Sequence, residues 1–483
     1  MKTMKYLLLG ALVLSSSAAV KAQEGASAAE QVKEILKNKP ADADKQIKAI
    51  YKKNKKNMET VVGIARAFYE ANDTANAHVY AQYAADKNYP AAYLLLGDIQ
   101  AKGDHEGAGG AASTMYRQAI YFAKQAGGTI DETPYYRYAS INRGVNLTDA
   151  ISMLDQLGEY APELAANGRV NLLKGRVYDL ANRVEDAAKA YAQVPLNALE
   201  ERDFLSAARA NYLLGEYNKS QEIVDYGLKS YPRKFTYNQL GMFNHTQLKN
   251  YDKALEYADR MLNQSDSVKM NPEIYGVYAK ALNGAKKHQE AIDVYKKTLE
   301  LEFDSQDKKA GVIKDLADAY KGIDDYENAV TYYDLFLKTV SHASLTDYAD
   351  LGRLYVQYAD KLEGDAKIEK LTKADQIYSD LAEKNADAKE YSLFWRARVN
   401  QMMDPEAKDG KAQPFYEELF NAIMEKAEKD KADMARVKEA GQYLMVYYLK
   451  IKDDTQRSIE FAEKLLTVDP ANETATQIVS MKK

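Results

Sequence analysis

The chain has 483 residues, a formal net charge of −5 and no cysteine. The lack of cysteine excludes disulfides, thiolate metal sites, a cysteine nucleophile and a lipid anchor on an N-terminal cysteine. A hydrophobic share of 46% can form a core and argues against general disorder. Proline is rare, at 10 residues, and alternating runs rich in valine, isoleucine and threonine are scarce, so we predict an all-α fold.

Residues 1–22 have the pattern of a secretory signal peptide. Lys2 and Lys5 give a charged start, residues 6–14 are apolar, and small residues precede a cleavage site after Ala22. A membrane anchor is the alternative, but the apolar run is far shorter than the roughly 20 residues that span a bilayer. We therefore expect an exported, soluble protein of the periplasm or envelope that is not lipid-anchored.

Cleavage at this site removes Lys2, Lys5 and Lys21 and no acidic residue, which leaves 63 basic and 71 acidic residues and a formal charge of −8. An acidic chain is a poor match for the phosphate backbone, so nucleic acid is excluded as the main ligand. No later segment is apolar enough to span a membrane, and none is expected after signal cleavage.

Residues 23–57 read as a polar leader with two short helices, over 28–36 and 43–53. The lysine-rich run at 52–56 is typical of a solvated loop. From residue 58 to residue 470 the pattern changes to repeated helix pairs, and residues 471–483 suit a closing helix.

Small residues recur in the predicted first helix of each pair, where they let two antiparallel helices approach closely. Each is followed, after about twelve residues, by apolar residues at i, i+4 and i+7, which share one face of a second helix. Proline is predicted to open first helices at Pro90, Pro134, Pro232 and Pro272. These small anchors are Ala65, Gly97, Ala139, Gly175, Ala208, Met242, Ala279, Ala317, Gly352, Ala397 and Val446.

The clearest repeat contains Gly175, Tyr178, Ala187 and Tyr191, and in this pattern the chain resembles the tetratricopeptide repeat family. The resemblance is degenerate, because the tryptophan typical of the first helix is replaced, where it can be aligned, by Phe204, Tyr275, Ile313 or Tyr348. It implies a right-handed α-α superhelix of about eleven helix-turn-helix repeats, with a concave groove lined by first helices. It also implies a scaffold that binds a partner protein or an extended peptide in that groove.

Catalytic patterns are absent from the sequence. The five histidines have no metal-binding or catalytic spacing, and we find no nucleophile elbow, phosphate loop or calcium loop. His105 lies between Asp104 and Glu106 in a glycine-rich stretch, where a flexible polar loop is a better explanation than a metal site. We predict a non-enzymatic protein with no cofactor and no metal.

Tyrosine is abundant, with 38 residues, and aromatic faces can stack on sugars. A glycan-binding protein related to outer-membrane polysaccharide-uptake components is therefore the alternative function. Against it, the chain has one tryptophan, and many tyrosines occupy helix-packing positions. Those predicted to be buried in the core are Tyr178, Tyr191, Tyr295, Tyr320 and Tyr333.

The residue after each small anchor faces the groove in the family's geometry, and six of these eleven are basic. We predict that they contact a partner protein or peptide, with an acidic one as an option, because guanidinium and ammonium groups grip carboxylates. The alternative is pairing with neighbouring acids such as Asp179 or Asp318. The six candidate site residues are Arg66, Arg176, Arg209, Lys280, Arg353 and Arg398.

Two tripeptides resemble an O-glycosylation acceptor motif of some bacterial envelopes: Asp73-Thr74-Ala75 and Asp266-Ser267-Val268. The function predicted from the sequence is a non-enzymatic interaction scaffold of the bacterial envelope.

Overall fold

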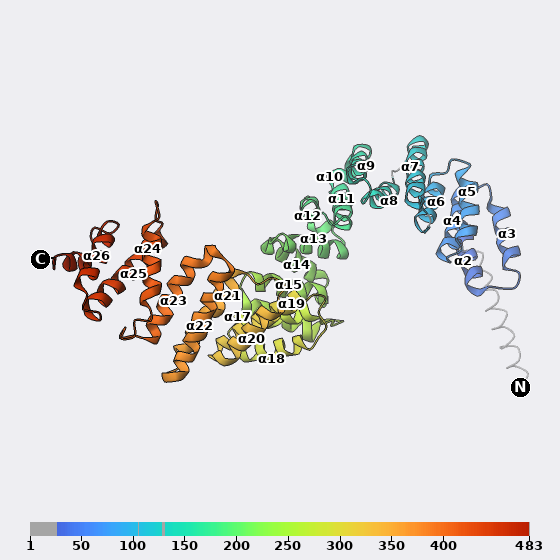
Figure 1. Ribbon diagram of the computed structural model, residues 1–483. Helices are drawn as coiled ribbons and strands as arrows, with labels where there is room; N and C mark the ends of the chain where they lie inside the picture. Colours follow the sequence, from blue (N-terminus) through green and yellow to red (C-terminus); the bar gives the residue numbers. More distant parts are fainter. Residues whose placement is uncertain (1–26, 105, 128–130, 483) are drawn as a thin grey trace, which may run out of the picture. The chain divides into compact units, whose positions relative to one another are not determined.

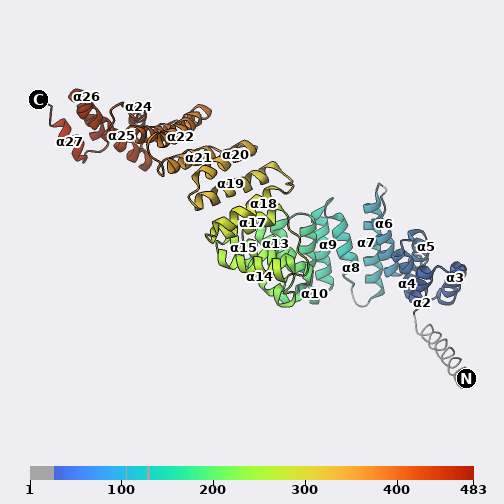
Figure 2. The same ribbon diagram turned by 90° about the horizontal axis from the view of Figure 1, so that it is seen from below.

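The computed structural model describes residues 27–104, 106–127 and 131–482, so the predicted signal peptide and His105 lie outside the described residues. Every regular element in these ranges is a helix, which confirms the all-α prediction. The chain divides into two compact units, an N-terminal unit up to Pro232 and a C-terminal unit from Arg233 (Figure 1). Within each unit, a helix packs mainly against its neighbours in the sequence (Figure 2).

The N-terminal unit is built from consecutive antiparallel helix pairs. A short helix, α10 (Pro162–Ala166), is added before α11, and a leading pair precedes the repeats. In chain order the pairs are α2 (Ala28–Asn38) with α3 (Ala43–Asn54), α4 (Met58–Glu70) with α5 (Thr74–Ala85), α6 (Pro90–Ala101) with α7 (Ala108–Ala126), α8 (Thr133–Asn142) with α9 (Leu147–Tyr160), α11 (Arg169–Leu180) with α12 (Val184–Tyr191), and α13 (Glu201–Leu213) with α14 (Tyr217–Ser230).

The C-terminal unit continues the same construction and ends with α27 (Glu473–Val479), whose Ala475 and Ile478 are buried against the last pair. Its pairs are α15 (Phe235–Gln247) with α16 (Tyr251–Asp259), α17 (Pro272–Gly284) with α18 (His288–Leu299), α19 (Gln306–Gly322) with α20 (Tyr326–Thr339), α21 (Leu345–Ala359) with α22 (Gly364–Lys384), α23 (Lys389–Met403) with α24 (Gln413–Met424), and α25 (Lys431–Lys450) with α26 (Thr455–Leu466).

Local sequence explains where these helices begin and turn. Side-chain oxygens of Asn, Asp or Ser accept a hydrogen bond from the first helical turn and satisfy an otherwise unpaired N–H. Such N-caps are Asn57, Asp73, Asn146, Asn271, Ser305, Asp325, Ser344, Asp430, Asp454 and Asn472.

The turn between first and second helix recurs in one form. One residue takes a left-handed conformation, with φ between 54 and 77°, which Asn, Asp and Gly adopt more readily than other residues. The residues at this position are Asn72, Asn182, Gly215, Lys249, Lys286, Asp324 and Asp453.

A tyrosine ring lying on a glycine defines the contact within several pairs. The rings are 0–8% exposed, and a Cβ added to the glycine would come within 3 Å of a ring atom, closer than van der Waals contact allows. The pairs are Gly97 with Tyr116 (2.4 Å), Gly175 with Tyr191 (2.8 Å), Gly241 with Tyr257 (2.4 Å) and Gly352 with Tyr378 (2.6 Å).

Three details of the predicted register differ from the structure. In α15 the residue in contact with the ring is Gly241, next to the predicted anchor Met242. In α25 the predicted anchor Val446 is 39% exposed, and the close approach is at Gly441 instead, where an added Cβ would lie 3.0 Å from the ring of Phe420. Pro232 does not open a helix, since α15 begins at residue 235. In α15 and α25 the glycine at the close contact lies one and five residues before the predicted anchor, because the face of the helix that meets its neighbour decides the position.

We expect Gly97→Ala to destabilise the N-terminal unit. Alanine improves helix propensity by about 1 kcal/mol, but forcing its methyl against a buried ring costs about 1–3 kcal/mol. The ring of Tyr116 cannot move freely, because its hydroxyl lies 3.0 Å from Asp98 Oδ1. Urea denaturation of the full chain, followed by circular dichroism, measures the change in unfolding free energy.

The matched control is Gly110→Ala on α7, where no atom lies within 4 Å of the added Cβ. This variant should be neutral or more stable than the unmodified chain. Equal behaviour of the two variants would contradict the role of the ring contact.

Candidate functional site

Ion pairs join successive first helices of the N-terminal unit and form what we call the ion-pair ladder. The two partners of each bridge are 27–39 residues apart in sequence, because they come from neighbouring repeats. The bridges are Arg137 with Asp98 (3.5 Å), Arg169 with Glu132 and with Glu200 (3.4 Å), Arg176 with Asp203 (2.7 Å), and Arg209 with Asp179 (2.8 Å).

The most buried bridge of this ladder is the one between Arg176 and Asp203. The Nε and Nη2 of Arg176 each donate to an oxygen of Asp203 at 2.7 Å, and Glu200 lies 3.1 Å from Nη2. Arg176 is 6% exposed and Asp203 1% exposed. Burial opposes the charged form, but the hydrogen bonds and negative charge of Asp203 outweigh it and raise the pKa of Arg176. The bonds of this guanidinium therefore link α11 to α13.

The C-terminal unit carries a similar ladder. Arg353 donates to the hydroxyl of Tyr391 at 2.8 Å and also pairs with Asp350 on its own helix. Among the further bridges between elements of this unit are Lys314 with Asp347 (2.6 Å), Arg398 with Glu439 (2.6 Å), and Lys426 with Glu390 (2.7 Å) and Asp433 (2.9 Å).

The six predicted site residues thus fall into two classes. Arg176, Arg209, Arg353 and Arg398 have acidic partners within the ladder, and for Arg209 the partner is Asp179, as the ion-pair alternative anticipated. Arg209, Arg353 and Arg398 keep side chains that are 41–57% exposed.

Arg66 on α4 and Lys280 on α17 form the second class. Both are exposed, and neither side chain has an ion-pair partner within the described ranges. Arg66 belongs to the N-terminal unit and Lys280 to the C-terminal unit.

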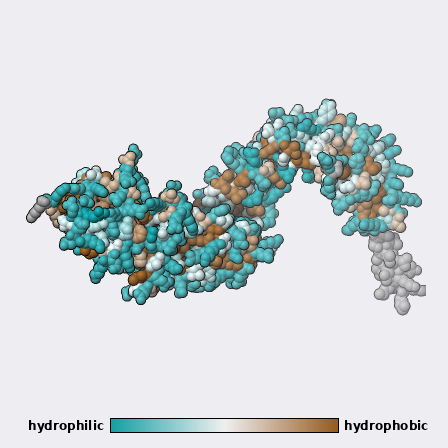
Figure 3. All heavy atoms as spheres, in the orientation of Figure 1, coloured by the Kyte–Doolittle hydropathy of each residue, from teal (hydrophilic) through white to brown (hydrophobic). Residues whose placement is uncertain are grey.

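Exposed apolar residues mark the C-terminal ends of three successive first helices, α8, α11 and α13. Arg143 Nε donates to the carbonyl of Leu180 at 3.2 Å, and the Arg209–Asp179 bridge joins the next two ends. Figure 3 shows apolar surface gathered in the region of α11 and α13. We call this set the apolar row: Val145 (87% exposed), Leu180 (48%), Leu213 (59%) and Leu214 (43%).

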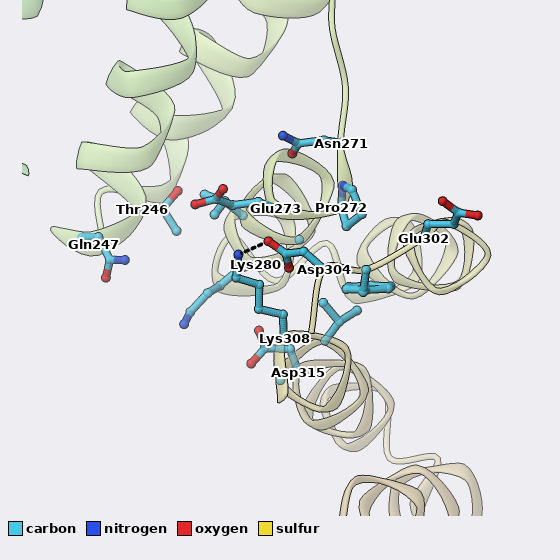
Figure 4. A pocket seen from close by; sticks show the side chains of 15 residues that line it. Thr246, Gln247, Asn271, Pro272, Glu273, Lys280, Glu302, Asp304, Lys308 and Asp315 are labelled. Atoms are coloured by element: carbon cyan, nitrogen blue, oxygen red, sulfur yellow. Dashed lines mark hydrogen bonds and ion pairs between the residues drawn. The ribbon is translucent and has the colours of Figure 1, made fainter. Parts of the chain in front are cut away.

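A pocket of about 500 Å³ lies on three successive first helices of the C-terminal unit, α15, α17 and α19 (Figure 4). Its apolar lining comes from Pro272, Val277, Phe303 and Val312. Its charged lining is Glu273, Lys280, Glu302, Asp304, Lys308 and Asp315. Of the six predicted residues, the pocket contains Lys280 alone.

Sequence reasoning missed this pocket, although a signal for it exists. Gly276 and Gly311 line it from the middle of α17 and near the start of α19, 35 positions apart and therefore one repeat apart. A helical glycine has no side chain, so two in equivalent repeats leave a hollow on the helix face. They went unnoticed because they do not sit at the anchor position.

Most of the conspicuous tyrosines pack inside the units. Tyr191, Tyr295, Tyr320 and Tyr333 are 0–6% exposed, as predicted, whereas Tyr178 is only partly buried. Among the described residues, the aromatic side chains that are more than half exposed are Tyr121 and Tyr160.

Both candidate glycosylation residues are exposed. Thr74 is the first residue of α5, and Ser267 lies in the segment before α17. In the described part of the chain, no three histidine or acidic side chains gather as metal ligands would. None of the helices in those ranges has the length and apolar character needed to cross a bilayer.

No protein-family model and no curated protein sequence matches the chain. Among solved structures it is similar to the C-terminal part of a TPR repeat-containing protein from Cytophaga hutchinsonii, at 18% identity and TM-score 0.45, over 57% of this chain and 98% of that one. A tetratricopeptide repeat protein from Parabacteroides merdae is also similar, at 18% identity and TM-score 0.32, over 54% and 98%. A third similarity is to Naa15/Naa10 bound to HypK-THB, at 13% identity and TM-score 0.29, over 90% and 67%.

These TM-scores lie below 0.5, so the assignment of the fold as an all-helical repeat rests on the helix pairs themselves.

The ion-pair ladder predicts that Arg176 and Arg209 contribute very differently to the free energy of unfolding. Arg176→Ala leaves Asp203 buried without its cation, which costs about 3–5 kcal/mol. Arg209→Ala removes an exposed bridge, worth about 0–1 kcal/mol. Chemical denaturation of both variants measures the difference, and similar losses would show that the ladder does not depend on burial.

Proposed function

We propose that this chain is a non-enzymatic scaffold of a bacterial envelope that binds a partner protein along its first helices. Export would follow from the signal pattern in residues 1–22. The observation that carries the proposal is the apolar row on α8, α11 and α13. Exposed apolar side chains rimmed by charged groups are typical of protein–protein interaction sites.

The ion-pair ladder supports this function by holding the row in place. Arg143 and the Arg209–Asp179 bridge connect the helix ends that carry Leu180 and Leu213. A surface that is already ordered loses little conformational entropy when a partner binds. Four apolar side chains fixed on successive helices can therefore act together as the centre of an interface.

Basic residues of the same unit extend the proposal. Arg66 has no acidic partner in the described ranges, and Arg209 stays 57% exposed beside Asp179. Both can pair with carboxylates of a partner, so the acidic character expected from the sequence remains part of the proposal for this unit.

Site-specific photo-cross-linking in the producing bacterium tests the function. A benzophenone amino acid placed at Leu180 or Leu213 should cross-link one and the same protein. The same probe at Val79, which is 63% exposed on the second helix α5, should not give this product.

Two outcomes would contradict the scaffold. One is the absence of an adduct at both leucines, and the other is an adduct that contains only a second copy of this chain.

The double variant Leu180→Ser, Leu213→Ser is expected to lower the yield of the partner complex at least tenfold, which corresponds to about 1.4 kcal/mol of binding free energy. Both side chains are largely exposed, so the unfolding free energy should change by no more than about 0.5 kcal/mol per site. Co-purification from the envelope fraction measures the yield, with Val79→Ser as the matched control. An unchanged yield would show that the apolar row does not contact the partner.

A further inference from the structure

The pocket on α15, α17 and α19 is hollow because two of its helices lack side chains where they face it. A Cβ built on Gly276 would have its nearest neighbour, a Val312 methyl group, at 3.6 Å. A Cβ built on Gly311 would have no neighbour within 4 Å. The resulting space of about 500 Å³ lies within the range of about 300–1,000 Å³ typical of ligand pockets.

The inside of this space suits an apolar group. Pro272, Val277, Phe303 and Val312 line it, and each is only partly buried by the rest of the chain. Filling the hollow with an apolar side chain would remove these surfaces from water, which is favourable by about 25 cal/mol per Å².

The charges around the space do not cancel. Asp304 and Lys308 form a bridge at 2.6 Å and neutralise each other. This leaves one cation, Lys280, against three carboxylates, those of Glu273, Glu302 and Asp315, none of which has an ion pair in the described ranges. In Figure 4, Glu273 and Asp315 lie on opposite sides of the bridge.

The charged form of Asp315 is disfavoured at its position in the pocket. Burial raises the pKa of Asp315, Lys280 acts in the opposite direction, and the neighbouring Asp318 adds to the rise. A positive charge brought close to this carboxylate would relieve the unfavourable burial.

We propose that this pocket binds an extended protein segment in which a large apolar residue, such as Leu, Met or Phe, stands beside Lys or Arg. The apolar side chain fills the space left by Gly276 and Gly311, and the cation pairs with Asp315. The proposal rests on the protein-binding function above and gives the C-terminal unit a partner chemistry of its own. An acidic segment fits less well, because Lys280 is outnumbered.

Gly311→Leu is the variant that isolates the pocket. The pocket is open at this position, where an added Cβ has no neighbour within 4 Å, and leucine favours the helix more than glycine does, so the fold should not weaken. Gly110→Leu on α7, also without neighbours within 4 Å, is the matched control in the other unit.

The experiment selects random dodecapeptides displayed on phage against the full chain and removes those that also bind the Gly311→Leu variant. The remaining peptides should carry Lys or Arg within two residues of Leu, Met or Phe. A synthetic, fluorescein-labelled copy of the most enriched peptide is then titrated by fluorescence polarisation. Affinity should fall at least about tenfold for Gly311→Leu and about fivefold for Asp315→Asn, and should stay the same for Gly110→Leu.

The same peptide with glutamate in place of its basic residue should bind at least about tenfold more weakly. The proposal is overturned if the selected peptides are acidic, if Gly311→Leu does not weaken binding, or if no peptide separates the two proteins. Each of these results leaves the cross-linking at Leu180 and Leu213 intact as a measure of the scaffold function. If that cross-linking were lost while peptide binding to the pocket was preserved, the apolar row would instead be ruled out as a binding surface.

Discussion

The structure depends on how closely two antiparallel helices can approach at the small residue of the first helix. Where that residue is glycine, a tyrosine ring from the second helix lies directly on the backbone, as Tyr257 does on Gly241. Dispersion contacts of this kind weaken quickly with distance, so a single added methyl group separates the pair. Each pair is then a rigid block, and its outer face must be covered by the next block.

Charge distribution follows from that stacking. Four of the six basic residues beside the small anchors have acidic partners, as Arg176 has Asp203 and Arg398 has Glu439. An arginine held in this way positions helices and leaves few groups for a partner. The groups best placed to meet a partner are the exposed side chains of the apolar row, the exposed Arg66, and Lys280 with the carboxylates around the pocket.

Much of the fold could be predicted because it is local. The spacing of apolar residues at i, i+4 and i+7 gives the second helices, and Asn, Asp and Ser give the N-caps. The site could not be predicted to the same degree. Whether Arg176 is free or buried depends on Asp203 in the next repeat, 27 positions away, while the partner of Arg398 is 41 positions away. No fixed spacing connects such residues, so a basic residue at the right position does not reveal its partner.

The ring-on-glycine contact is kept while the distance along the chain varies. Tyr follows Gly by 16 residues at Gly175 and Gly241, by 19 at Gly97 and by 26 at Gly352, where α22 is a helix of 21 residues. The additional residues lengthen the second helix or its loop, and the ring still reaches the same spot. The repeats thus share one contact and differ in their number of residues. Extra turns of helix between the first and second helices can therefore be accepted without disturbing the pairs on either side.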